Sequence, residues 1–108
     1  MEVKIKATRL ELTDAIREYI ETKMAMVEKY LGTKVKVLNW DFEIEKAVGG
    51  QNKGEIFRAE VNLEVPGEML RIEKTESNLY KAIDKVKDHL ELAVKKYKEK
   101  LIDKRRGK

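Results

Sequence analysis

The chain has 108 residues, of which 42% are hydrophobic and 41% are charged. This length suits one domain with a single core, and the charged fraction is far above the roughly 25% of an average globular protein. The absence of cysteine excludes disulfides, thiolate catalysis and cysteine-ligated metals. No apolar run approaches the roughly 20 residues that span a membrane, and the N-terminus lacks a signal peptide's apolar stretch. These features favour a cytoplasmic protein.

The residue inventory argues against an enzyme. The sequence contains one histidine, His89, and one serine, Ser77. Ser77 precedes a helical pattern and is interpreted as a helix cap, and a lone histidine cannot form the usual histidine-rich metal site. No glycine pattern for binding phosphates is present. We therefore expect no catalytic residues, no metal, no cofactor and no small-molecule substrate.

The first 32 residues predict a strand followed by a helix. Apolar and polar residues alternate over 2–7, which is typical of a short strand. Apolar residues then recur every three or four positions, which predicts a helix over 13–31. Thr13 is suited to cap its start, and Gly32 is suited to end it.

The middle of the chain predicts three strands. Alternation over 34–47 indicates a long strand, and a change of parity near Leu38 predicts a bulge there. A flexible hairpin loop over 48–54 separates it from a strictly alternating strand over 57–65. After a Pro-Gly turn, a short fourth strand is expected over 70–73.

The last helix begins at Ser77, with apolar residues every three or four positions as far as Leu101. The predicted order is β-α-β-β-β-α, an α+β fold. A right-handed crossover makes the first two strands parallel, and the last three form an antiparallel meander. Because both helices are amphipathic, they should cover one face of a four-stranded sheet in a two-layer sandwich.

The positive charge is concentrated at the C-terminus. Residues 95–108 contain eight basic and two acidic residues, whereas the whole chain carries a net charge of only +4. Basic residues favour a helix C-terminus, so a solvated helix end is one interpretation. The stronger one is a surface that binds a polyanion. At 100° per residue, the lysines opposite the apolar stripe are Lys81, Lys85, Lys95 and Lys96.

Aromatic residues give a second, weaker signal. Tyr19, Lys23, Met26 and Tyr30 share one flank of the first helix. The favoured interpretation is that both tyrosines widen the core stripe while Lys23 extends past them toward a ligand. A basic–aromatic strip that contacts nucleic acid is the alternative. Trp40 is interpreted as a core residue rather than a platform for bases.

The segment 77–84, SNLYKAID, resembles the D-[ML]-Y-A-A-I-D signature of the ribosome hibernation-promoting factor family. This family is also called protein Y, sigma-54 modulation protein or ribosomal protein S30EA. The segments 15–23, 28–31, 65–71 and 95–101 resemble other parts of the same family, as does the order of elements. The resemblance implies a fold similar to double-stranded-RNA-binding domains. It also implies binding to rRNA of the small ribosomal subunit, in the channel of mRNA and tRNA, which blocks translation and protects idle ribosomes.

The resemblance extends the candidate contacts. Lys23, Lys96, Lys98 and Lys100 match basic positions of the family, whereas Met26, His89 and Leu92 stand where it usually has basic residues. The predicted RNA-binding residues are Lys23, Lys81, Lys85, Lys87, Lys95, Lys96, Lys98, Lys100, Arg105 and Arg106. The alternative function is a protein–protein adaptor of the same fold that uses exposed Leu92 and the edge strand.

The expected organisation is a single ribosome-binding domain over 1–103, followed by a basic tail over 104–108. As given, the chain resembles the short form of the family, which lacks a C-terminal dimerisation domain. The expected partner is the small ribosomal subunit, with no membrane partner. The sequence does not define the oligomeric state, and it is compatible with a monomer.

Overall fold

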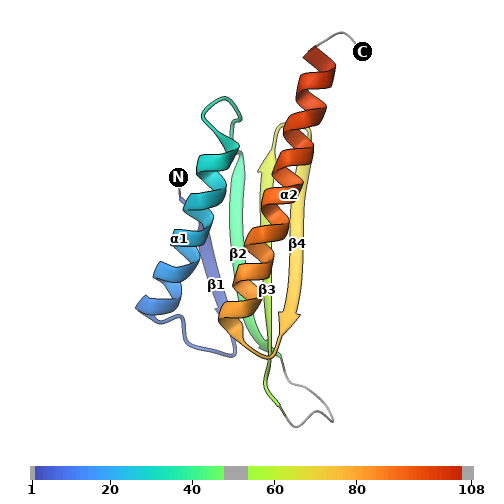
Figure 1. Cartoon of the computed structure of the whole chain (residues 1–108). Helices are drawn as coiled ribbons and strands as arrows, with labels where there is room; N and C mark the ends of the chain where they lie inside the picture. The colour runs from blue at the N-terminus through green and yellow to red at the C-terminus, as the bar shows by residue number, and fades with distance from the viewer. Residues whose placement is uncertain (1, 48–53, 106–108) are drawn as a thin grey trace.

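The computed structural model describes residues 2–47 and 54–105, with side chains as far as Asp103. The predicted order of elements is confirmed (Figure 1). In chain order, the elements are β1 (Lys4–Thr8), α1 (Asp14–Leu31), β2 (Asn39–Ala47), β3 (Ile56–Val65), β4 (Glu68–Glu76) and α2 (Leu79–Arg105).

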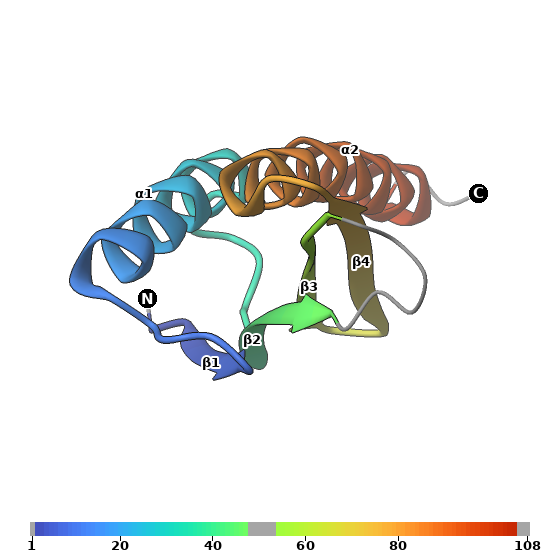
Figure 2. The same ribbon diagram turned by 90° about the horizontal axis from the view of Figure 1, so that it is seen from below.

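The four strands form one sheet in the order β1-β2-β3-β4. β1 pairs in parallel with β2, and the other two pairs are antiparallel, as the topology predicted. Seen from below, α1 and α2 lie side by side on one face of the sheet, which confirms the two-layer arrangement (Figure 2). Neither helix of the described ranges covers the opposite face of the sheet (Figure 2).

Alternation along the strands divides the sheet into an apolar and a polar face. Phe42, Val61 and Ile72 occupy one register row and face the helices. Trp40 and Phe42 are each only 1% exposed, so the prediction that Trp40 is a core residue is confirmed. The polar residues between these positions lie on the open face.

Two predicted strand boundaries are wrong. β2 begins at Asn39, so residues 34–38 precede the strand and the change of parity there requires no bulge. β4 covers Glu68–Glu76 and is therefore longer than the predicted 70–73. The strand starts earlier than predicted because the turn at Pro66 and Gly67 is tight, so Val65 pairs directly with Glu68. Gly67 has a φ of 85°, which favours glycine.

The helix caps are partly as predicted. The Oγ1 atom of Thr13 accepts a hydrogen bond from the Ile16 N–H at 3.2 Å, and Gly32 ends α1 with a φ of 86°. Ser77, however, does not cap α2. The Oδ1 atom of Asn78 accepts from the Lys81 N–H at 3.1 Å, so the cap lies one residue later than expected.

α2 continues across the predicted boundary between residues 103 and 104 and ends at Arg105. Its last turns extend past the end of the sheet (Figure 1). Tyr97 fixes this half of the helix, because its buried hydroxyl donates to the Pro66 carbonyl at 2.7 Å. Residues 48–53 of the predicted hairpin loop and Arg106 lie outside the described residues.

Candidate nucleic-acid interface

The outer face of α2 carries the cations that the sequence placed there. Val86, Leu90 and Val94 are fully buried against the sheet, which turns the opposite side of the helix outward. The exposed residues on that side include Lys81, Lys85, His89, Leu92, Lys95 and Lys96. The helical period therefore gives a reliable account of which side chains face solvent.

Two of these cations, Lys81 and Lys85, are not free, because a carboxylate of the same molecule pairs with them. Glu76 at the end of β4 pairs with Lys85 and lies 4.0 Å from the Nζ atom of Lys81. The hydrogen bond from Lys85 holds the pKa of Glu76 below its usual value, against an opposing effect of burial. The pair therefore remains ionised at neutral pH, and both lysines are partly neutralised.

Lys87 and Lys100 are paired in the same way. The Nζ atom of Lys87 lies 3.2 Å from Glu91 and 3.5 Å from Asp88, and its side chain is only 17% exposed. Lys100 lies 3.5 Å from Glu68, at the start of β4. Lys87 was among the predicted RNA-binding residues, but the structure turns it toward the carboxylates of its own helix.

Lys95 and Lys96 differ from the other candidates. Both are exposed, and within the described part of the chain neither forms an ion pair. Lys98, one turn of helix away from Lys95, donates a hydrogen bond to the Tyr30 carbonyl at 3.0 Å. Its Nζ atom also lies 5.5 Å from the centre of the Tyr30 ring, so Lys98 holds α2 against the end of α1. The exposed lysines of α2 without an ion pair, Lys95 and Lys96, therefore lie in the C-terminal half of the helix.

Lys23 belongs to a cluster between the helices that sequence reasoning missed. Its Nζ atom lies 3.3 Å from Asp84 and 5.2 Å from the centre of the Tyr19 ring. The Tyr19 hydroxyl donates to Asp84 at 2.5 Å, and its ring packs edge-on against Tyr80. The signature residues Tyr80 and Asp84 therefore join the two helices. Lys23 is half-buried in this cluster rather than extended toward a ligand.

The prediction for the aromatic flank of α1 is correct for Tyr19 and wrong for Tyr30. Tyr19 packs partly buried against the core, whereas 42% of Tyr30 is exposed. Tyr30 lies in the last turn of α1, and Lys98 of α2 lies over its ring. Met26 and Leu92 are 45% and 57% exposed. The helix layer thus combines free lysines with exposed apolar groups.

The open face of the sheet has the opposite electrostatic character. Arg58 donates to Glu45 at 2.9 Å, to Glu43 and Glu60 at 3.1 Å, and to Glu73 at 3.0 Å. One guanidinium group therefore donates hydrogen bonds to four carboxylates, and the side chains of this network are mostly acidic. A polyanion approaching the molecule meets repulsion here and attraction at α2.

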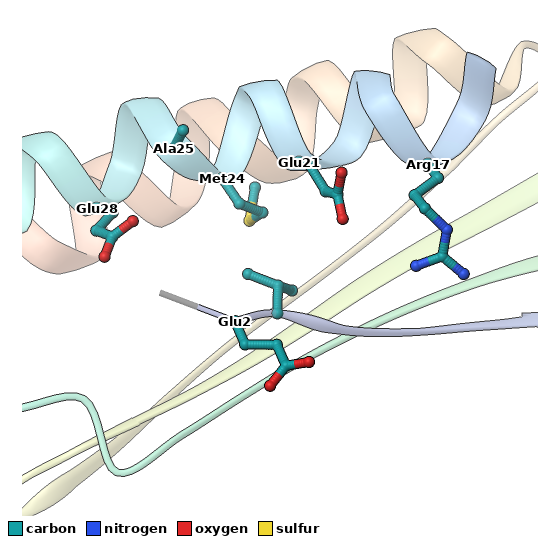
Figure 3. A pocket seen from close by; sticks show the side chains of 7 residues that line it. Glu2, Arg17, Glu21, Met24, Ala25 and Glu28 are labelled. Atoms are coloured by element: carbon teal, nitrogen blue, oxygen red, sulfur yellow. The ribbon is translucent and has the colours of Figure 1, made fainter. Parts of the chain in front are cut away.

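A cavity of about 440 Å³ opens between α1 and the N-terminal end of β1 (Figure 3). Figure 3 shows Glu21 and Arg17 of α1 pointing toward the side of the cavity where Glu2 lies. Three of its seven lining residues are glutamates, the third being Glu28. The cavity is therefore unsuited to phosphate and lies away from the outer face of α2.

The described residues show neither a metal site nor a membrane-spanning helix. They contain no cluster of three or more histidine or acidic residues that could hold a metal ion. No helix within the described ranges is long and apolar enough to cross a membrane. The charges of Arg105 and Arg106 cannot be placed on the interface, because their side chains lie outside the described part of the chain.

The fold and the charge distribution define a small two-layer α+β module with a cationic helix layer. The family model described as "Sigma 54 modulation protein / S30EA ribosomal protein" matches residues 3–102. The chain belongs to this family. The family model covers nearly all of the described residues, which confirms the resemblance inferred from segment 77–84.

Two curated relatives illustrate the range of the family. The chain is 32% identical to a ribosome hibernation promoting factor of Azotobacter vinelandii, over 99% of this chain and 92% of that protein. It is 30% identical to a ribosome hibernation promotion factor of Deinococcus radiodurans, over 94% of this chain. The chain spans about half the length of the Deinococcus relative and of a Lactococcus lactis relative.

Solved structures agree with this assignment. The N-terminal domain of Thermus thermophilus Protein Y superimposes with a TM-score of 0.69 and 33% sequence identity, covering 90% of this chain and 99% of that one. A ribosomal subunit interface protein from Coxiella burnetii has a TM-score of 0.72 at 20% identity, covering 92% and 99%. The second likeness concerns the fold alone.

Proposed function

We propose that this chain binds the small ribosomal subunit and occupies its mRNA and tRNA channel, inhibiting translation in the cytoplasm without catalysis or a cofactor. The relatives named as ribosome hibernation factors support an association with the ribosome. The observation that carries the proposal is the pair of exposed, unpaired lysines, Lys95 and Lys96, on a helix layer opposite an acidic sheet face. Such a charge distribution orients the protein on RNA.

In this proposal Lys95 and Lys96 bind rRNA phosphates directly. Lys81, Lys85 and Lys100 contribute less, because a bond to phosphate competes with their carboxylate partners. Lys23, Lys87 and Lys98 act mainly by holding the interface in shape. Phosphate contacts and RNA shape then dominate recognition, so binding weakens as salt rises.

The test is co-sedimentation with purified small subunits from about 50 to 200 mM salt, where phosphate-dominated binding changes strongly. We expect binding that falls with salt and is displaced by tRNA. The double variant Lys95→Glu and Lys96→Glu should lose binding. The matched control, Lys4→Glu and Lys6→Glu, makes the same change of charge at exposed positions of β1 and should bind normally. Equal binding by both variants contradicts the proposed site.

A protein–protein adaptor is the second candidate, favoured by the 57% exposure of Leu92. An interface of this kind depends weakly on salt. Leu92→Glu would then reduce binding more than the lysine reversals do. This result, measured in the same sedimentation assay, would indicate that the surface binds a protein and not rRNA.

A further inference from the structure

A small cleft lies between the last turn of α1 and the middle of α2, which run side by side (Figure 1). Its volume is about 230 Å³, below the roughly 300–1,000 Å³ of pockets for drug-sized ligands. The residues that line it are Tyr30, Asp88, Glu91, Leu92 and Lys95. We propose that this cleft binds one unstacked nucleobase, a guanine, of the RNA that the protein contacts. The inference rests on the proposed function and adds base recognition to it.

Two residues supply the apolar walls that a planar base requires. Tyr30 is 42% exposed and Leu92 is 57% exposed, so both are accessible from solvent. Unpaired bases of RNA commonly stack on aromatic side chains. Lys98 holds the Tyr30 backbone through its bond to the carbonyl, and its Nζ atom lies over the ring, 5.5 Å from the centre. A base would therefore stack on the face of the ring away from Lys98.

The polar residues of the cleft match the edge of a base. Asp88 and Glu91 offer carboxylate oxygens, which only accept hydrogen bonds. Guanine presents two neighbouring donors, N1–H and the N2 amino group, that suit the two oxygens of one carboxylate. Uracil has a single ring N–H and forms fewer such bonds.

Charge within the cleft also fits a nucleotide. Lys87 pairs with Asp88 and Glu91, which offsets their negative charge beside an RNA backbone. Lys95 lines the cleft, is exposed and forms no ion pair within the described residues, so it can bind the phosphate of the same nucleotide. The cleft therefore brings together a stacking surface, hydrogen-bond acceptors and a phosphate ligand.

The apolar side chain of Leu92 also fits this proposal. Leu92 cannot bind a phosphate, but it forms a wall of the cleft. An apolar wall at this position favours contact with the face of a base over contact with a second phosphate.

The test is a titration of the isotope-labelled chain with single ribonucleoside monophosphates, followed by NMR. Guanosine monophosphate should shift the signals of the Tyr30 ring and the Leu92 methyl groups at lower concentration than uridine monophosphate. Inorganic phosphate, the control ligand, should leave these two residues unchanged. Equal shifts with all four nucleotides overturn the choice of guanine, and no shift at Tyr30 or Leu92 overturns the cleft.

Variants separate stacking from a general loss of structure. Tyr30→Leu should weaken binding of guanosine monophosphate about tenfold, as expected for one lost base–aromatic stack, whereas Tyr30→Phe should bind like the parent chain. Tyr80→Leu is the matched control, because Tyr80 is 38% exposed on the same helix layer but does not line this cleft. Equal weakening by Tyr30→Leu and Tyr80→Leu contradicts the proposal.

Sedimentation with small subunits distinguishes this inference from the proposed function. Salt-dependent subunit binding without any nucleotide effect at Tyr30 overturns the cleft and leaves the proposed function standing. Nucleotide binding at Tyr30 without co-sedimentation supports the cleft and overturns the proposed function. If Leu92→Glu abolishes a salt-independent interaction with subunits and no nucleotide binds, the cleft docks a protein and the base-binding proposal is wrong.

Discussion

The hydroxyl group of Tyr19 on α1 donates a hydrogen bond to the carboxylate of Asp84 on α2 at 2.5 Å, across 65 residues of sequence. The same carboxylate pairs with Lys23, so two side chains of α1 converge on one acid of α2. Asp84 belongs to the segment that resembles the family signature. The relationship gives this signature a physical role, which is to fix the two helices that form the proposed interface.

Removing the Tyr19 hydroxyl should therefore loosen the helix layer. Tyr19→Phe should lower the free energy of unfolding at pH 8 by about 2 kcal/mol, the usual value of a hydrogen bond to a charged group. The control Tyr80→Phe also removes one hydroxyl, but this hydroxyl has no hydrogen bond in the described structure. Urea denaturation measures both. Identical values for the two variants would show that the Tyr19 bond contributes nothing.

The Tyr19 contribution should also depend on pH. The hydrogen bond to Asp84, with smaller effects of burial and charge, raises the pKa of Tyr19 from 10.0 to about 12. Because the folded state holds this proton more tightly, the stabilisation is complete below pH 10 and is lost as the pH rises toward 12. The difference between the parent chain and Tyr19→Phe should shrink over that window, as urea denaturation at a series of pH values would show.

The sequence predicted the fold far better than it predicted the chemistry of the helix layer. Periodicity of two and of about 3.6 residues identifies each element, because burial of one face controls it locally. Ion pairs are different, since Glu76 and Lys85 come together only when β4 and α2 pack. Exposure of Tyr30 likewise depends on how far α2 covers the end of α1. The helical period therefore identified Lys81, Lys85, Lys95 and Lys96 as exposed, but not which of them lack an ion pair.

The same limit applies to the start of α2. Ser77 and Asn78 are neighbours, and both are good capping residues. The packing of Leu79, only 7% exposed, decides between them by placing the first turn of the helix. A sequence pattern alone does not resolve this one-residue difference.

This correction of the α2 cap can be tested directly. Asn78→Ala should lower the free energy of unfolding by about 1 kcal/mol, because the Lys81 N–H loses its acceptor. Ser77→Ala, the neighbouring control, should change it by much less. Thermal and urea denaturation measure both variants. A larger effect at Ser77 than at Asn78 would restore the cap that the sequence suggested.

The stability of the protein should depend on the Arg58 network on the open face of the sheet. Arg58→Met keeps an unbranched apolar stem but leaves four glutamates on three neighbouring strands without their shared partner. We expect the free energy of unfolding at pH 7 to fall by about 2 kcal/mol, because hydrogen bonds to charged groups are lost. Arg71→Met is the control, since this side chain is 65% exposed and its ion-pair distance is 4.0 Å.

The stability lost in Arg58→Met should diminish at acidic pH. The hydrogen bond from Arg58 lowers the pKa of Glu45 from its ordinary 4.5, against an opposing effect of burial. A lowered pKa gives stabilisation that is present above pH 4.5 and is lost as the pH falls through the folded-state value. Urea denaturation of Arg58→Met and the parent chain should therefore converge below pH 4.5. A constant difference down to pH 3 would mean that Arg58 acts through packing and not through these carboxylates.

Glu76 should act as an internal competitor of the RNA. Its carboxylate pairs with Lys85 and lies 4.0 Å from Lys81, so it reduces the charge that these lysines present to phosphate. Glu76→Gln keeps the size of the side chain, releases both lysines and should tighten binding to small subunits with a steeper dependence on salt, because more counterions are displaced. Glu64→Gln makes the same change of charge on the open face of the sheet and should bind like the parent chain. Co-sedimentation across the salt series measures both, and equal affinities for the two variants would place Lys81 and Lys85 outside the interface and confine it to the C-terminal half of α2.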